Sequence, residues 1–364
     1  MVKMTPRRWL ALTLSLVVLA LSGIAGAVIL IDPFQIYREA TRFIAPISSG
    51  TQSYSNAGVA RRYAYDSLVI GSSMTENFVP SALDALFGGS FVKLCINGGS
   101  SFNHRQMMDI AFDTHAVRRV LYGLDVDALT YFYTQPKTEM PEYLYDDFWP
   151  NDVHYWYNVS VLSHYLPQCL STWGRSDPGQ RDAMYAWGDL YPYGRDYALL
   201  RTVFDTKVFS QKEPPAPFVM SQQTMLNVEH NIVPFLEAHP ETEFLFFFPP
   251  YSLARWYAFY RTGDLAMHLS QAEAVCARLM DFPNVRVYDY RARTDWILDL
   301  SNYIDDYHYG PWINEAIAQD MAKTPGVQGP EAVRQNSLRI AALVDQIVAA
   351  GRWPDRFALS EPTD

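Results

Sequence analysis

The chain has 364 residues, of which 49% are hydrophobic and 19% charged, a composition that supports a large buried core and excludes an intrinsically disordered protein. Its formal net charge of −10 argues against nucleic acid as a partner, because phosphate backbones are bound by concentrated basic surfaces. Cys95, Cys169 and Cys276 are far apart and form no C-x-x-C pair, so the sequence predicts neither a zinc site nor a disulfide framework.

The first predicted element is a transmembrane helix. Three basic residues precede an almost uninterrupted apolar run over residues 9–31, which as a helix would be roughly 34 Å long, enough to cross a hydrocarbon core of about 30 Å. The basic flank predicts a cytoplasmic N-terminus, with the main domain periplasmic or extracellular. A cleaved signal peptide is the alternative, with Ala25-Gly26-Ala27 as its cleavage site, but the apolar run continues beyond that site. This length favours an uncleaved anchor over residues 1–32.

The rest of the chain predicts a stalk and an α/β domain. Residues 33–62 are expected to form an irregular or weakly helical stalk, and from residue 63 to residue 364 β-rich runs alternate with helical patterns. This alternation predicts a three-layer sandwich, with a mainly parallel sheet between helices. The expected strands are Asp66–Gly71, Phe91–Ile96, Arg119–Leu124, Glu243–Phe248 and Val285–Tyr288, and the expected helices cover 74–87, 102–116, 218–238, 264–281 and 331–350.

The pattern is less regular between residues 130 and 217, where the sequence is rich in aromatic residues and contains several prolines. One interpretation is an insertion over one end of the sheet, where the loops of such folds form binding surfaces. The other is a helical subdomain that only enlarges the core. The sequence does not distinguish between them.

The first chemically informative segment is the buried strand that runs into Gly71-Ser72-Ser73. A hydroxyl on such a turn is exposed at the carboxyl end of the sheet, beside backbone N–H groups, which is a position suited to a nucleophile. However, Ser73-Met-Thr-Glu76 also matches an S-x-x-E capping box, so Ser73 is alternatively the cap of a helix.

A second segment near the C-terminus supplies a base and a carboxylate. Asp305 and His308 lie three residues apart, about one helical turn, so the carboxylate can orient the imidazole while its other nitrogen faces a hydroxyl. Together with Ser73, these residues form a candidate Ser-His-Asp triad.

These two segments resemble motifs of the SGNH hydrolase superfamily. Its first block, Gly-Asp-Ser, reads here Gly71-Ser72-Ser73, and its last block, Asp-x-x-His, reads Asp305-Asp306-Tyr307-His308. The resemblance covers roughly residues 63–320 and implies a serine-dependent acyl esterase or acyltransferase, in which Ser73 attacks an acyl carbonyl, His308 is the general base and Asp305 orients the ring.

Two further blocks match in part and concern the oxyanion hole. Asn97-Gly98-Gly99 follows the second strand, where the family has an oxyanion-hole glycine, and Gly123-Leu124-Asp125 follows the third, where the family has Gly-x-Asn-Asp. A carboxylate at Asp125 would repel a developing oxyanion unless it were protonated. Either Asn97 supplies the donor, or backbone N–H groups form the hole, or activity is weak.

With its single N-terminal anchor, the chain is similar to the membrane-tethered branch of that superfamily, the exported partners of membrane-bound O-acyltransferases. That resemblance implies an acylated cell-envelope glycan or exopolysaccharide as substrate, an integral-membrane acyltransferase as partner, and no cofactor. The alternative function is a catalytically inactive assembly or scaffold protein with a vestigial triad, which Asp125 also suits.

The other candidate site residues give weaker indications of function. The other histidines form no cluster with metal-ligand spacing, so no metal is predicted. The run Phe246–Tyr251 is expected to be a buried strand that ends at two prolines on the same crevice as Ser73, which makes Tyr251 and Arg255 candidates for substrate contact.

Overall fold

The computed structural model describes residues 5–201, 217–351, 353–354 and 356–359. The chain divides into two compact units. The first contains residues 1–63 and 140–178, and the second contains residues 64–139 and 179–364. The predicted insertion at 130–217 is thus shared between the two units, and its residues 202–216 lie outside the described residues.

The second unit is built on a parallel sheet of five strands in the order β2-β1-β3-β4-β5. Aliphatic and aromatic side chains make the central strands suited to burial on both faces, and all five residues of β1 are buried. The strands are β1 (Ser67–Gly71), β2 (Phe91–Cys95), β3 (Arg119–Gly123), β4 (Glu243–Phe248) and β5 (Val285–Asp289). The predicted mainly parallel α/β fold is confirmed, with each strand boundary within one residue of its expected position.

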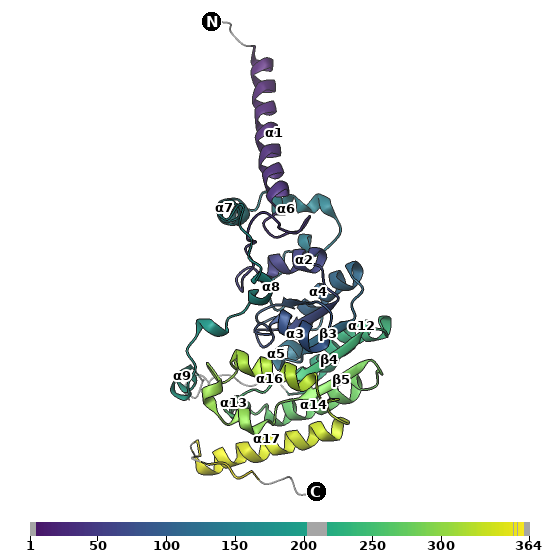
Figure 1. Cartoon of the computed structure of the whole chain (residues 1–364), viewed down its shortest axis with the longest axis vertical. Coiled ribbons are helices and arrows are strands. Elements are labelled where there is room, and N and C mark those ends of the chain that lie inside the picture. Colours follow the sequence, from purple (N-terminus) through teal and green to yellow (C-terminus); the bar gives the residue numbers. More distant parts are fainter. Residues whose placement is uncertain (1–4, 202–216, 352, 355, 360–364) are drawn as a thin grey trace. The chain divides into compact units, whose positions relative to one another are not determined.

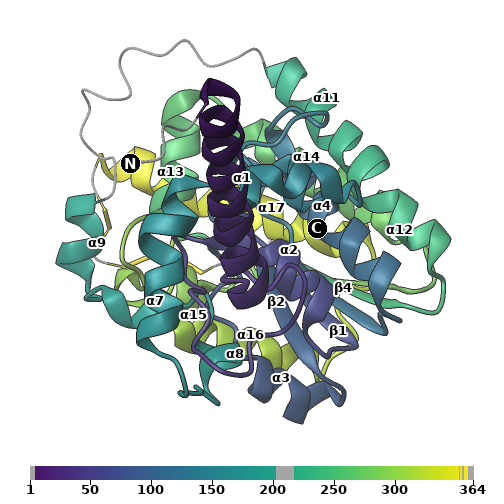
Figure 2. The same ribbon diagram turned by 90° about the horizontal axis from the view of Figure 1, so that it is seen from above.

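Helices cover both faces of this sheet. Figure 2 shows α3 (Pro80–Phe87) and α16 (Pro311–Met321) on one side of the strands, with α4 (Ser101–Thr114), α12 (Val233–Ala238) and α14 (Leu265–Leu279) on the other. The long α17 (Pro330–Ala350) packs against α13 (Leu253–Thr262) and α14 (Figure 1). The shorter helical segments are α5 (Val126–Thr130), α8 (Gln180–Ala183), η4 (Gly188–Leu190), α9 (Arg195–Arg201), α11 (Pro217–Asn227), η5 (Val228–Ile232), α15 (Thr294–Ile297) and η6 (Leu300–Asn302).

The helix predicted over 74–87 was wrong at its start. Residues 73–77 form consecutive turns, and α3 begins only at Pro80, with Val79 as its N-cap residue. Proline at the first helical position explains this start, because its φ angle suits a helix and its missing N–H would have no partner there. The predicted helix over 218–238 is three segments, α11, η5 and α12, and Pro234 lies at the start of the last one.

The strand order reverses between β1 and β3, because β2 lies on the far side of β1 from β3, β4 and β5. Open parallel α/β sheets bind ligands outside the carboxyl ends of the strands at such a switch point. The turn after β1 contains Ser73, and the loop after β3 contains Asp125. The topology therefore brings these two parts of the chain to the same crevice.

The first unit consists of α1 (Pro6–Ile31), α2 (Gln52–Arg62) and a series of short helical segments from the middle of the chain. The stretch predicted as a stalk, 33–62, contains α2, most of whose residues are buried. The short segments are η1 (Glu142–Leu144), η2 (Trp149–Asp152), α6 (Val153–Trp156), the π-helical η3 (Val161–Tyr165) and α7 (Leu166–Ser171).

Helix α1 is long and apolar enough to cross a membrane, and most of its side chains are exposed. It ends at Ile31, and the carboxylate of its C-cap residue Asp32 accepts hydrogen bonds from the backbone N–H groups of Ile36, Tyr37 and Arg38. The first turn after the helix therefore has its backbone donors satisfied by a side chain rather than by water.

Candidate active site

Ser73 lies on the tight turn that follows β1. The backbone N–H of Thr75 donates to the carbonyl of Ser72 at 2.9 Å, which closes the turn. Gly71 is required before it, because a Cβ atom there would come within 2.6 Å of the Thr75 side chain. Since α3 begins at Pro80, Ser73 caps no helix, and the capping-box interpretation was wrong. The hydroxyl is instead aimed at the loop that contains His308.

Three predicted site residues form a continuous hydrogen-bonded relay. Ser73 Oγ lies 2.9 Å from His308 Nε2, and His308 Nδ1 lies 2.9 Å from Asp305 Oδ2. The other oxygen of Asp305 accepts the backbone N–H groups of Tyr307 at 2.8 Å and His308 at 2.6 Å. This geometry is the one a general base needs: within hydrogen-bond reach of a hydroxyl, and held by a carboxylate on its far side.

The loop that presents His308 is fixed at both ends. Tyr303 and Tyr309 form an isolated antiparallel bridge, and the backbone N–H of Ile304 donates to the carbonyl of His308 at 3.0 Å. Tyr309 also donates its hydroxyl to the carbonyl of Met74 at 3.1 Å, which ties the loop directly to the serine turn. These contacts hold two segments 235 residues apart in the sequence in a fixed position.

The surroundings of His308 raise the pKa of its imidazole. Burial lowers the pKa of the imidazole, but the hydrogen bond and negative charge of Asp305, helped by the charges of Asp125 and Glu76, outweigh it and raise that pKa above its ordinary value. For Asp305, burial raises the pKa, but the hydrogen bond and charge of His308 outweigh this effect and lower it. The carboxylate thus stays ionised and stabilises an imidazolium.

Trp187 supports the same pair from a part of the chain where the sequence predicted no site residue. Its indole Nε1–H donates to the carbonyl of Ser73 at 3.0 Å, and its ring meets the His308 ring edge-on, with centroids 5.3 Å apart. Nothing in the local sequence indicated this role, because Trp187 lies in an irregular aromatic region. Tyr307, by contrast, is adjacent to His308 in the Asp-x-x-His block and could have been suspected from that position.

Asp125 is in the crevice but cannot donate to an oxyanion. Its carboxylate accepts hydrogen bonds from the hydroxyls of Ser72, Tyr307 and Tyr251, the last at 2.9 Å, and from the backbone N–H of Asp127 at 2.9 Å. Four donors thus surround this one buried carboxylate and hold it in place as an acceptor. Asp125 therefore organises the residues around it rather than facing the reaction as a donor.

Asn97, Gly98 and Gly99 form the turn after β2 and line the same pocket. The N–H of Gly99 is used within the turn, where it donates to the carbonyl of Ile96 at 3.0 Å. Within the described parts of the chain, the backbone N–H groups of Gly98 and Ser73 make no hydrogen bond. Asn97 is exposed, and its carbonyl accepts from the Thr138 hydroxyl at 3.1 Å.

The pocket at this site is open and polar, with a volume of about 270 Å³. Arg255 enters it from α13, between the rings of Phe259 and Tyr307, with its guanidinium carbon 4.5 Å and 4.9 Å from their centroids. Its nearest carboxylates are Asp306 at 3.7 Å and Asp127 at 4.0 Å, beyond hydrogen-bond length. The residues that line the pocket are Ser72, Ser73, Asn97, Gly98, Gly99, Asp125, Asp127, Arg255, Tyr307 and His308.

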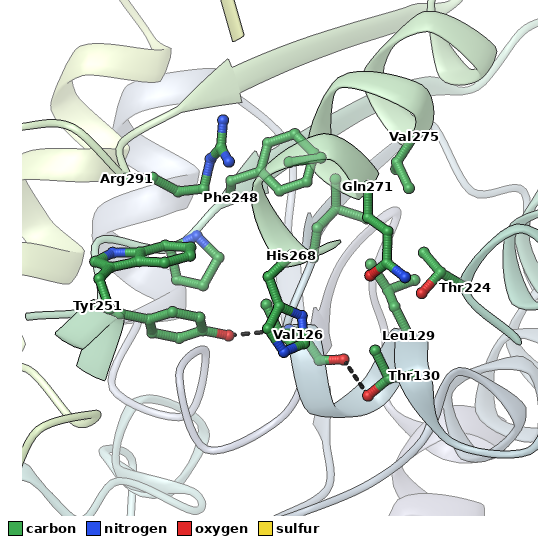
Figure 3. A pocket seen from close by; sticks show the side chains of 14 residues that line it. Val126, Leu129, Thr130, Thr224, Phe248, Tyr251, His268, Gln271, Val275 and Arg291 are labelled. Carbon is green, nitrogen blue, oxygen red and sulfur yellow. Dashed lines mark hydrogen bonds between the residues drawn. The ribbon is translucent and has the colours of Figure 1, made fainter. Parts of the chain in front are cut away.

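A second, smaller cavity lies between β4, α13 and α14 and is drawn in Figure 3. Its volume of about 20 Å³ suits a single water molecule rather than a substrate. Tyr251 lies at its edge, where the phenol oxygen accepts the Val126 N–H at 3.0 Å (Figure 3). His268 faces this cavity, and burial lowers its pKa to about 4, so this ring is neutral near pH 7.

The histidines outside the site give no sign of a metal centre. The buried His104 pairs its Nδ1 with the Tyr122 hydroxyl at 2.8 Å, as a core residue does. Among the residues that the structure describes, no group of three or more His, Cys, Asp or Glu side chains is placed to hold a metal ion.

Comparisons with known proteins do not assign this chain to a family. The chain matches no family model, and no curated protein is detectably similar to it. A similar solved structure is a chain from Streptococcus pneumonia that is provisionally described as a platelet activating factor. It is 12% identical, the match covers 76% of this chain and 90% of that one, and the TM-score is 0.38.

Proposed function

We propose that this chain is a membrane-anchored serine O-acyl esterase or acyltransferase that acts outside the cytoplasm. The observation that supports it is the relay from Ser73 through His308 to Asp305, in an open pocket at the carboxyl edge of a parallel sheet. An exposed apolar helix at the N-terminus supports the anchor. The motifs resemble those of SGNH hydrolases, which use these residue types for acyl transfer.

The chemistry proceeds in two halves. Ser73 Oγ attacks the acyl carbonyl carbon while its proton passes to His308 Nε2, and Asp305 stabilises the imidazolium that forms. The ester C–O bond then breaks, His308 returns the proton to the leaving alkoxide, and an acyl-serine remains. In the second half a water or a sugar hydroxyl gives its proton to His308 Nε2 and attacks the acyl carbon. The bond from that carbon to Ser73 Oγ breaks, and His308 returns the proton to Oγ, which restores the serine hydroxyl.

The oxyanion hole is built from backbone donors. The N–H groups of Ser73 and Gly98 lie on this rim and make no hydrogen bond within the described residues. Asn97 lines the same pocket and is a third candidate donor. Asp125 is excluded as a donor because its oxygens already accept hydrogen bonds from hydroxyls and a backbone N–H.

The substrate class we propose is an acylated cell-envelope glycan or exopolysaccharide. Arg255, Asp127 and Asn97 give the pocket a mixture of donors and acceptors, which suits a hydroxyl-rich ligand. By the resemblance of the motifs, a membrane-bound O-acyltransferase would supply the acyl group as the partner.

The decisive experiment is labelling of the purified full-length protein with a fluorophosphonate, together with turnover of 4-nitrophenyl acetate. We expect Ser73→Ala to abolish both with little change in melting temperature. Ser72→Ala is the matched control, since its hydroxyl is adjacent but bonded to Asp125, and this variant should still be labelled. Absence of labelling in the wild-type protein, or equal labelling of Ser73→Ala, contradicts the proposal.

A second candidate is a non-catalytic assembly factor, which the carboxylate at Asp125 favours. This function predicts that activity in cells persists in Ser73→Ala, and that a membrane acyltransferase co-purifies with that variant. It also predicts that the co-purification is lost when residues 9–31 are replaced by an unrelated anchor. An enzyme would instead lose its cellular activity with the serine.

A further inference from the structure

A stretch of the first unit has an unusual composition. Residues 153–173 contain no Asp, Glu, Lys or Arg, although 19% of the chain is charged. The same 21 positions include Tyr155, Trp156, Tyr157, Tyr165 and Trp173. Aromatic residues with one polar atom are enriched where a protein meets the headgroup region of a bilayer.

This stretch lies alongside the C-terminal part of α1. Both α6 and α7 contact α1, and Tyr157 donates its hydroxyl to the carbonyl of Leu21 at 3.1 Å. Leu21 is ten residues before the end of α1 at Ile31, about 15 Å back along the helix axis. The stretch therefore reaches well along a helix proposed to cross the membrane.

Large apolar side chains on and next to this stretch are exposed. Val159 is 77% exposed and Trp149 is 67% exposed, and Phe148, Leu170 and Trp173 are also exposed. Soluble surfaces rarely gather so many large apolar groups without a partner. On α1 only Ala25 and Val28 are buried, so the exposed apolar surface of the helix continues onto that of the stretch.

Three polar side chains beneath this surface find partners within the protein. Trp156 donates its indole N–H to the Tyr37 hydroxyl at 2.7 Å, and Tyr37 donates to Asp152 at 2.8 Å. The Tyr155 hydroxyl donates to the Asp32 carboxylate at 3.1 Å. A segment near hydrocarbon needs this arrangement, because unpaired polar groups there cost several kcal/mol each.

We propose that residues 148–173, the collar, are embedded in the outer headgroup and upper acyl region of the lipid bilayer around α1. The ligand of this surface is lipid, argued from its continuity with the apolar face of α1 and from the absence of charged side chains over 153–173. The inference rests on the membrane anchor of the proposed function and goes beyond it, since a plain signal anchor needs no such surface.

The test uses the full-length protein in phosphatidylcholine nanodiscs, with nitroxide spin labels at single introduced cysteines. The three native cysteines are buried, and unlabelled wild type is the background control. Val159→Cys reports the collar, Leu16→Cys reports α1, and Leu338→Cys, exposed on α17 of the second unit, is the matched surface control. Collisions with oxygen indicate lipid, whereas collisions with a water-soluble nickel chelate indicate solvent.

We expect the labels at 159 and 16 to collide with oxygen and to be shielded from nickel, with 338 showing the reverse. Nickel access at 159 with lipid exposure at 16 overturns the collar but leaves the anchor intact. Shielding of 159 from both reagents also overturns it, because a second copy or a membrane protein then covers the surface. Nickel access at 16 contradicts the anchor itself. Leu170→Cys repeats the measurement if Val159→Cys fails to fold.

Discussion

Two carboxylates, the buried Asp125 and the partly buried Asp305, flank the serine turn, and they differ in where their hydrogen-bond donors lie in the sequence. Asp305 accepts from His308 and from backbone N–H groups within three residues of itself. Asp125 accepts from Ser72, 53 residues away, and from Tyr251, 126 residues away. The first arrangement orients one reacting ring, whereas the second holds several segments of the fold together around a charge.

This difference predicts that replacing the carboxylate by an amide has a large effect on kcat at Asp305 and a small one at Asp125. Asp305→Asn should lower kcat for an aryl acetate by about 10⁴-fold, because an amide favours the wrong tautomer of His308. Asp125→Asn should retain most of the wild-type kcat, since Asp125 does not touch the reacting atoms in the proposed mechanism. Steady-state kinetics on both variants checks this, with melting temperatures to exclude unfolding. Equal losses in the two variants would break the comparison.

The contrast between local contacts and contacts of distant segments also explains which features the sequence could predict. The strands and the Asp-x-x-His block depend on local patterns, so they were readable from composition and spacing. The order β2-β1-β3-β4-β5 and the donors to Asp125 depend on contacts between distant segments, which no window of sequence contains. Trp187 was missed for that reason, and the start of α3 was missed because the tight turn after Ser73 outweighed helical periodicity.

The second prediction concerns stability. Tyr251→Phe removes a hydrogen bond to the Asp125 carboxylate and leaves the Val126 N–H without its acceptor. We expect the free energy of unfolding to fall by about 2 kcal/mol, the usual contribution of a hydrogen bond to a charged group. Urea denaturation measures it, and Tyr260→Phe, an exposed tyrosine on α13, is the control that should change little. A loss no larger than that of the control would mean that Asp125 does not organise the fold.

The third prediction concerns Arg255 in the pocket that Ser73, His308 and Asp125 line. The guanidinium of Arg255 makes no hydrogen bond within the described residues, so its N–H groups are available to a substrate oxygen. We expect Arg255→Gln to raise KM about fivefold for an acetylated sugar, the effect of losing one hydrogen bond of about 1 kcal/mol. The variant Arg286→Gln, on an exposed position of β5, is the matched control. An unchanged KM would remove Arg255 from the binding site.

The smallest expected effect is a shift in pH dependence. The pKa of His308 is raised, so the base form, and with it kcat/KM, becomes available only as the pH rises through that higher value. Asp125 contributes to this increase after Asp305 does. Asp125→Asn should therefore move the midpoint of the kcat/KM profile to lower pH, with Glu331→Gln as a distant control. A midpoint that moves upward would show that the charge of Asp125 does not act on the imidazole.

The indole of Trp187, in edge-to-face contact with His308 and hydrogen-bonded to the carbonyl of Ser73, gives the molecule a built-in optical probe. Imidazolium quenches indole emission far more than neutral imidazole does. The difference in fluorescence between the wild-type protein and Trp187→Phe therefore follows the protonation of the His308 ring. Acylation of the serine can then be watched in real time without a chromogenic leaving group. The reaction with a natural polysaccharide, which releases no coloured product, can then be measured directly.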